Sequence, residues 1–229
     1  MPESQSCIVV GVGPGLGAAV GRRFAAAGYN VALAARGPEK LAPFVDEIEA
    51  AGGTAKAYGA DATDEGQVTA LFEAVEADLG PCAVAVFNAS GRVRSGIAGI
   101  GAEEFLEAWK RSCYGGFLVG REAAKGMQAR GGGTILFTGA TASVKSYAGS
   151  AGFAVGKYGL RALAESMARE LQPENIHVAH FVIDGGIGHD DGDARLDPDA
   201  IAETYYQTHA QHRSAWAWEV ALRPWVEKF

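Results

Sequence analysis

A glycine-rich stretch near the start of the chain has the spacing of a phosphate-binding turn; it reads Gly11-Val12-Gly13-Pro14-Gly15-Leu16-Gly17. An apolar run, 7–10, precedes it, and an alanine-rich segment that favours a helix, 18–27, follows it. Because glycine has no Cβ, the backbone can take a positive φ in such a turn and a phosphate can come close. The helix then directs its free amides and its positive dipole end at that phosphate. The stretch therefore predicts a nucleotide-binding site.

The end of the next apolar run, 30–35, indicates which nucleotide binds. In dinucleotide-binding folds the tip of the second strand contacts the adenosine ribose. An acid there accepts hydrogen bonds from the 2′-hydroxyl of NAD, whereas a cation without that acid suits the 2′-phosphate of NADP. Ala35-Arg36 is the second arrangement, so we expect NADP(H) to be preferred over NAD(H). A solvated arginine at the end of a strand is the alternative interpretation.

A methyltransferase is a second class of protein with a glycine-rich first turn, because enzymes that bind S-adenosylmethionine share this feature. Those enzymes usually need an acid at the end of the second strand, where it binds the ribose hydroxyls. Ala35-Arg36 offers no acid. A methyltransferase therefore remains only a distant alternative.

Three later motifs follow predicted strands and are expected at the same edge of the sheet. Asp61 follows the apolar run 54–60 and is placed to accept a hydrogen bond from an adenine amino group. An acid that caps the next helix would occupy the same position, so this assignment has an alternative. Asn88 follows the run 83–87, and the glycine-rich loop 184–188 follows the sixth predicted strand. Ligands of open α/β sheets bind outside the carboxyl ends of the strands, which is where these motifs fall.

Short apolar runs without helical spacing alternate with segments of helical periodicity along the chain. This alternation predicts an α/β fold, a parallel sheet with helices on both faces. We expect a single-domain, Rossmann-type doubly wound sheet of about seven strands over 1–229, in which 188–213 forms the substrate-side loop and a short helix. The longest helices are expected at 102–130, loosened near Gly115-Gly116, and at 153–171. Strands are expected at 7–10, 30–35, 54–60, 83–87, 134–138, 176–183 and 214–222.

Composition limits the possible partners. The 229 residues suit one domain, and a net charge of −7 disfavours nucleic acid or an anionic membrane as a partner. No apolar run approaches the length of a membrane span, and the N-terminus lacks the basic and apolar regions of a signal peptide. Cys7, Cys82 and Cys113 lie in predicted core elements without metal-ligand spacing. We therefore expect a cytoplasmic protein with reduced thiols and no metal.

Taken together, these motifs resemble those of the short-chain dehydrogenase/reductase family over nearly the whole chain. Gly11, Gly15 and Gly17 match its G-x-x-x-G-x-G spacing, while its Asn-Ala-Gly motif appears as Asn88-Ala89-Ser90 and its Pro-Gly as Asp184-Gly185. The resemblance implies a small-molecule carbonyl or alcohol substrate of unknown identity. It also implies cofactor contacts at Gly11, Gly13, Gly15, Leu16, Gly17, Arg36, Asp61, Ala62, Asn88, Ala89, Lys157, Gly185 and Ile187.

The resemblance breaks at the catalytic positions. The family uses a Tyr-x-x-x-Lys pair, a serine thirteen residues before the tyrosine, and an asparagine on the preceding long helix. Its tyrosine exchanges a proton with the substrate oxygen, and its lysine lowers the pKa of that tyrosine and holds the ribose. Here Phe153 stands four residues before Lys157, Ala140 stands at the serine position, and Ser112 stands at the asparagine position. Phenylalanine cannot donate a proton, and a positioned general acid typically contributes about 10²–10⁴-fold in rate.

Two functions therefore remain open. The first is an atypical NADP(H)-dependent oxidoreductase with a non-standard proton donor. The second is a catalytically weak or inactive NADP(H)-binding protein, a sensor or a structural partner. Replacement donors with weak support are Tyr147, Ser143 and Thr141 in the loop over the site and His189 in the opposite loop. Cys113 has weaker support, since no base stands beside it in the sequence.

Apolar residues near the C-terminus predict self-association. We expect Trp216, Trp218, Trp225 and Phe229 to be exposed on a chain that has no second domain to cover them. An apolar patch of this kind usually marks a subunit contact. Family members also pair through their long helices and final strand. We therefore expect a homodimer or a homotetramer.

Overall fold

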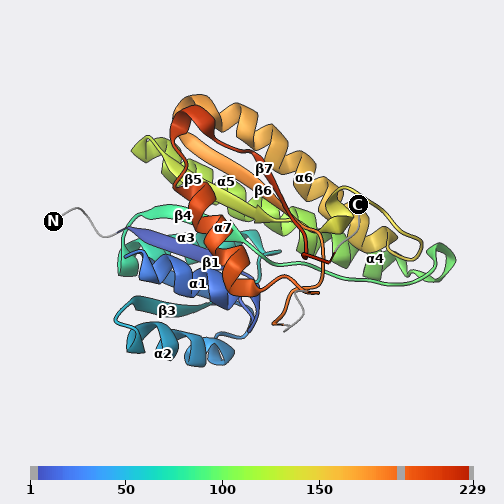
Figure 1. The fold of residues 1–229 in the computed structure, drawn as a ribbon, viewed down its shortest axis with the longest axis horizontal. Helices are drawn as coiled ribbons and strands as arrows, with labels where there is room; N and C mark the ends of the chain where they lie inside the picture. The colour runs from blue at the N-terminus through green and yellow to red at the C-terminus, as the bar shows by residue number, and fades with distance from the viewer. Residues whose placement is uncertain (1–4, 190–193, 227–229) are drawn as a thin grey trace.

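A seven-stranded sheet in the order β3-β2-β1-β4-β5-β6-β7 runs through the centre of the protein. The computed structural model describes residues 5–189 and 194–226 (Figure 1). All neighbouring strands pair in parallel, as predicted for a doubly wound sheet. The strands are β1 (Ser6–Val10), β2 (Asn30–Ala35), β3 (Thr54–Gly59), β4 (Cys82–Phe87), β5 (Gly133–Thr138), β6 (Ile176–Ile183) and β7 (Glu219–Leu222). The predicted Rossmann-type fold is confirmed.

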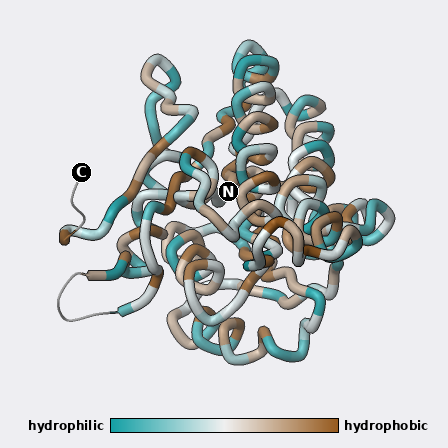
Figure 2. The backbone as a smooth tube through the Cα atoms, turned by 90° about the vertical axis from the view of Figure 1, so that its right-hand side faces the viewer, coloured by the Kyte–Doolittle hydropathy of each residue, from teal (hydrophilic) through white to brown (hydrophobic). Residues whose placement is uncertain are grey.

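Helices cover both faces of the sheet because apolar side chains project from both sides of its inner strands. Two hydrophobic clusters result, one on each face. The helices α3 (Glu65–Leu79), α5 (Gly115–Arg130) and α6 (Ala151–Leu171) pack on one face. The other face is covered by α1 (Leu16–Ala26), α2 (Ala42–Ala50) and α7 (Pro198–His209). Hydrophobic and hydrophilic residues alternate along these helices in Figure 2, as expected for helices with one buried side.

The order in which successive strands are added to the sheet reverses between β1 and β4. From β1 it builds outward through β2 to β3, and from β4 it builds outward the other way to β7. Such a switch point leaves a crevice at the carboxyl ends of the two central strands, because the connections leave in opposite directions. The glycine-rich turn after β1 and Asn88 after β4 both lie at this point. The topology therefore places the predicted nucleotide site at the centre of the sheet edge.

The long helix predicted over 102–130 is interrupted earlier than expected. It consists of α4 (Ala102–Trp109), a π-helical turn at Lys110–Tyr114, and α5. The predicted loosening near Gly115-Gly116 corresponds to this π-helical turn, which ends directly before the two glycines; the glycines themselves belong to regular α5. They serve close packing: a Cβ on Gly116 would lie 2.4 Å from Leu160 Cδ1, and one on Gly115 would lie 3.0 Å from the Ala62 carbonyl oxygen.

The strand predicted over 214–222 is wrong for its first half, because β7 begins only at Glu219. Trp216 precedes it, and its indole stacks flat on the His177 ring, with centroids 4.7 Å apart. Trp218 is half-buried under the Arg161 guanidinium. The expected exposure of these two tryptophans is therefore wrong, whereas Trp225 is 87% exposed. Phe229 lies outside the described residues.

Within the described part of the chain, no helix combines the length and the apolar character that a membrane span requires.

Candidate functional site

Two cavities adjoin along the carboxyl ends of the central strands. The first cavity, of about 350 Å³, lies at the ends of β1, β2, β3 and β4. The second cavity, of about 510 Å³, lies between the start of α1, the end of β5, α6 and the loop after β6. Asn88 and Ser90 line both cavities. All the cofactor positions expected from the sequence line one cavity or the other, except Gly13 and Gly17.

The glycines of the glycine-rich turn serve two purposes: two of them allow close packing, and two leave open space. Gly11 has a φ of +92°, and a Cβ there would lie 2.4 Å from the Ala89 backbone nitrogen. A Cβ on Gly17 would lie 2.8 Å from Val12 Cα, so both end positions are required by the fold itself. Gly13 and Gly15 have no atom within 4 Å of an added Cβ. The middle of the turn therefore leaves open space beside the free amides at the start of α1, which is where a phosphate would bind.

Asn88 secures this turn from the neighbouring strand. Its side-chain Nδ2 donates to the Gly11 carbonyl at 2.9 Å, and its backbone nitrogen donates to the Val10 carbonyl at 2.8 Å. The ends of β1 and β4 are thereby joined directly above the switch point. Asn88 is therefore a positioning residue for the turn as well as a lining residue of both cavities.

The first cavity combines a carboxylate with two cations. Asp61 Oδ1 accepts from the Thr63 backbone nitrogen at 2.9 Å and from its hydroxyl at 2.8 Å. Partial burial alone would raise the pKa of Asp61. The bonds from Thr63 and the charges of Arg36 and Arg111 outweigh it, so this pKa lies below its ordinary value. The helix that follows is capped by Asp64, whose Oδ1 accepts from the Gln67 amide at 2.9 Å. Asp61 is therefore left to line the cavity rather than cap that helix.

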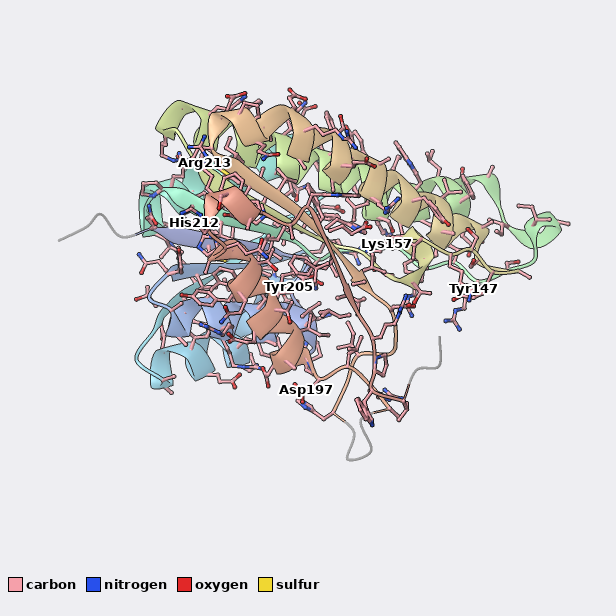
Figure 3. The ribbon with its side chains drawn as sticks, turned by 45° about the horizontal axis from the view of Figure 1, so that its top comes forward. Tyr147, Lys157, Asp197, Tyr205, His212 and Arg213 are labelled. Carbon is pink, nitrogen blue, oxygen red and sulfur yellow. The ribbon has the colours of Figure 1, made fainter. Side chains whose placement is uncertain are left out.

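Lys157 is buried at the floor of the second cavity. Its Nζ donates to the Thr138 carbonyl at 2.7 Å, and the side chain is only 3% exposed. Burial and the charge of Arg92 together lower the pKa of Lys157 to about 7. The Thr138 hydroxyl in turn accepts from the Tyr205 hydroxyl at 2.9 Å, so α7 supports the same strand end from the other face. Figure 3 shows Lys157 on the side of α6 that faces the sheet, with Tyr205 beyond it.

The second cavity is also lined by Phe153 and Ala140. The Phe153 ring centroid lies 6.0 Å from Lys157 Nζ and 4.9 Å from Arg92 Cζ, so two cations flank the ring. Ser112 does not line either cavity among the described residues. Its buried hydroxyl accepts from the Gly91 amide at 2.9 Å and contacts the Gly91 carbonyl at 3.3 Å. Ser112 therefore holds the loop that follows β4 and does not face the cavity.

The proposed replacement donors lie elsewhere, since none of them is among the described lining residues of the second cavity. Tyr147 is 50% exposed on the outer loop, away from Lys157 in Figure 3. His189 points into solvent and pairs through Nδ1 with Asp197 at 2.9 Å. Ser143 is buried, and its hydroxyl accepts from the Ala140 amide at 3.1 Å. Burial raises the pKa of the Cys113 thiol.

Three arginines join the site that sequence reasoning did not assign to it. Arg111 lines the first cavity, and Arg92 and Arg195 line the second. They come from the π-helical turn, the loop after β4 and the segment before α7, respectively. No local spacing links these three segments, so no signal in the sequence could have brought them together.

Comparisons with known proteins agree with this geometry. The chain matches the protein-family model described as short chain dehydrogenase over residues 5–187. It is 31% identical over 189 residues to the 3-oxoacyl-(acyl-carrier-protein) reductase MabA of Mycobacterium bovis, covering 82% of this chain and 71% of that protein. The solved structure of a short-chain dehydrogenase from Rhodopseudomonas palustris is 44% identical, with a TM-score of 0.90 and coverage of 98% and 100% of the two chains. A metagenomic short-chain oxidoreductase in complex with NADP is 29% identical, with a TM-score of 0.87 and coverage of 96% and 97%.

Proposed function

The chain belongs to the short-chain dehydrogenase family of oxidoreductases, and we propose that it is an atypical NADP(H)-dependent member acting on a small carbonyl or alcohol substrate. The observation that supports this most directly is the pair of adjoining cavities, one beside Arg36 and Asp61 and the other above Lys157. Together they run from the strand end that would bind adenosine to Lys157 on α6, the position of the lysine in the family's motif. The unobstructed middle of the glycine turn lies between them.

The residues present fit a nicotinamide dinucleotide. The glycine turn offers the free amides of α1 to the pyrophosphate, because Gly13 and Gly15 leave room there. Asp61 retains an oxygen beyond its bonds to Thr63 for the adenine amino group, and Lys157 is placed to hold ribose hydroxyls. When bound, the reduced nicotinamide supplies a hydride to a carbonyl carbon, while a proton goes to the oxygen and the alcohol forms. The protein must bind the substrate and supply or admit that proton.

A preference for NADP(H) is supported by the charges of the first cavity. The end of β2 carries no acid, and Arg36 and Arg111 both line this cavity. Arg36 makes no ion pair within residues 5–189 and 194–226, and the one such contact of Arg111 is at 3.9 Å, to Glu107. Both guanidiniums can therefore turn to a 2′-phosphate. Titration with NADPH and NADH by fluorescence tests this, and equal affinity for the two would overturn the proposed preference.

A second candidate is an NADP(H)-binding protein without turnover. The observation that favours it is that Phe153 and Ala140 line the second cavity at the positions where the family has its tyrosine and serine hydroxyls. Nucleotide binding together with no consumption of NADPH across ketones, aldehydes and quinones would support this candidate. Turnover of any of them by the native chain at a rate typical of enzymes would exclude it.

A homodimer or homotetramer is proposed on the basis of the outer surfaces of the helices. Several apolar side chains there are at least one-third exposed: Leu106 on α4, Phe117 on α5, and Val155 and Tyr158 on α6. Trp109, Tyr114 and Phe117 extend this surface as a row of ring contacts. Burying such a patch against a second copy would remove it from water. Light scattering at micromolar concentration tests this proposal, and a monomer would refute it.

A further inference from the structure

The described lining of the second cavity carries cations in a protein that is negative overall. Arg92, Lys157 and Arg195 line it, and none of its described lining residues is an aspartate or a glutamate. The chain as a whole carries a net charge of −7. Its arginines elsewhere are commonly paired, as Arg161 is with Glu219 and Arg130 with Glu76. The cations of the second cavity are therefore a local exception.

Of these cations, Arg92 says most about the charge of a ligand that would bind in the second cavity. Within residues 5–189 and 194–226 it has no carboxylate partner, and its guanidinium is held over the Phe153 ring instead, with Cζ 4.9 Å from the ring centroid. It also acts on Lys157 across the same cavity, where burial and then the Arg92 charge lower the lysine's pKa. Arg92 is exposed whereas Lys157 is buried, and two cations that face one space without an anion repel each other. A ligand with a negative charge between them would relieve that repulsion.

Arg195 says less about the substrate than Arg92 does, because it lies on a different side of the cavity. It lies against the loop after β6, where a Cβ on Gly188 would be 3.3 Å from its Nη1. This is the side of the cavity, beside Gly15 and Gly186, that the proposed cofactor would occupy. Arg92 instead stands over Phe153, where the family's tyrosine would meet the substrate oxygen. An anionic group of the substrate would therefore meet Arg92 first.

We propose that the second cavity binds a short oxo acid or the matching hydroxy acid, whose carboxylate pairs with the guanidinium of Arg92. This deepens the proposed oxidoreductase function and rests on it. The planar guanidinium offers two parallel N–H donors that match a carboxylate. Because the cavity of about 510 Å³ must also admit the nicotinamide end of the cofactor, the acid has to be small. Its carbonyl then lies within a few bonds of its carboxylate, beside Phe153.

The test is calorimetric binding to the protein saturated with NADP⁺, which cannot reduce an oxo acid. The probes are a panel of short 2-oxo and 3-oxo acids, each compared with its uncharged methyl ester. A charge-assisted pair should make the favoured acid bind roughly tenfold or more tightly than its ester. Arg92→Ala should remove this difference, whereas Arg92→Lys should retain part of it. Arg94→Ala is the matched control, because Arg94 is an exposed arginine of the same loop that does not line the cavity.

Two measurements distinguish a failure of the proposed function from a failure of the proposed role of Arg92. NADP⁺ is titrated first: a failure to bind it overturns the proposed function, and the acid–ester comparison is then made on the nucleotide-free protein. NADP⁺ affinity should be unchanged in Arg92→Ala, and a marked loss there would assign Arg92 to the cofactor and overturn the proposal. Equal binding of every acid and its ester by the native protein would overturn it as well. The same holds if Arg92→Ala and Arg94→Ala lose the preference equally.

Discussion

The two cavities of this site differ in how far they keep the groups that the family's chemistry needs. The first cavity retains the start of the glycine turn, Asp61 and Asn88, each of which lies at the end of a strand. The Asn88 side chain also bonds the Gly11 carbonyl. The second cavity retains Lys157 but has Phe153 and Ala140 where two hydroxyls are expected. Each of these substitutions removes one hydroxyl from a side chain of otherwise similar shape. The proposed cofactor-binding half is therefore preserved, and the proposed catalytic half is altered without any change of scaffold.

This difference teaches that binding and proton transfer depend on different parts of the structure. Binding rests mainly on backbone amides, glycine geometry and charge, which the topology of the sheet positions at its switch point. Proton transfer rests on single hydroxyl groups that packing does not require. Such groups can be lost, and restored, with little effect on the fold. The predictions below alter the two halves separately.

Restoring the hydroxyls should have the largest effect. In Phe153→Tyr with Ala140→Ser, the new phenol would stand one helical turn from Lys157, whose charge stabilises a phenolate. We expect NADPH-dependent reduction of reactive ketones or quinones to rise by about 10²–10⁴-fold over the native protein. Phe44→Tyr is the control, since it adds the same hydroxyl to a half-buried ring on α2 outside both cavities. High native activity that the double change leaves unaltered would mean that another residue carries the proton.

Lys157 should make the free protein less stable at neutral than at alkaline pH. Its pKa is lowered from 10.5 to about 7 by burial and by Arg92, so between these values the unfolded chain binds a proton that the folded chain does not. Stability should therefore rise with pH over this window, by about 1.4 kcal/mol for each unit of pKa difference. Lys157→Met should flatten this rise in denaturant titrations. Lys125→Met, at an exposed lysine on α5, should leave it intact. A native stability that falls over the same window would contradict the lowered pKa of the buried Lys157.

Gly11 should matter to folding more than other glycines with a similar backbone. In Gly11→Ala the backbone of the new alanine would have to keep the φ of +92°. Its Cβ would lie 2.4 Å from the Ala89 backbone nitrogen. We expect a loss of about 3 kcal/mol in the free energy of unfolding, from backbone strain and overpacking together. Gly28→Ala is the control, because its φ of +91° is similar but no atom lies within 4 Å. It should cost only about 1–2 kcal/mol. Equal losses would show that the contact with Ala89 relaxes freely.

Arg36 should contribute the smallest of these effects and should act only on cofactor choice. A charge-assisted bond to the 2′-phosphate contributes on the order of 1.5–3 kcal/mol, so Arg36→Ala should lower NADPH affinity roughly tenfold or more. NADH affinity should hardly change, since NADH lacks that phosphate. Arg213→Ala, at an exposed position beyond the C-terminal end of α7, serves as the control. An Arg36→Ala variant that keeps its preference would assign the phosphate to Arg111 instead.

Local sequence patterns were sufficient for the order of the elements and for most of the nucleotide site. Each strand of β1 to β6 falls within about a residue of its predicted bounds, because buried parallel strands read as short apolar runs between turn residues. The glycine turn and Asn88 could be placed because each follows a strand directly. The loss of the tyrosine hydroxyl was also readable, since Phe153 and Lys157 lie on one helical turn and their spacing is a local property.

Other features depend on contacts between distant segments, and only the tertiary structure decided them. The π-helical turn at Lys110–Tyr114 carries Arg111 into the first cavity, and the loop after β4 carries Arg92 over Phe153. Trp216 lies flat on His177, and β7 begins only at Glu219, after the first half of the strand expected there. The lowered pKa of Lys157 requires the burial of its side chain between α6 and the end of β5, which no spacing reveals. Periodicity and φ preference act over a few residues, whereas burial and the meeting of charges depend on how the whole sheet is wound.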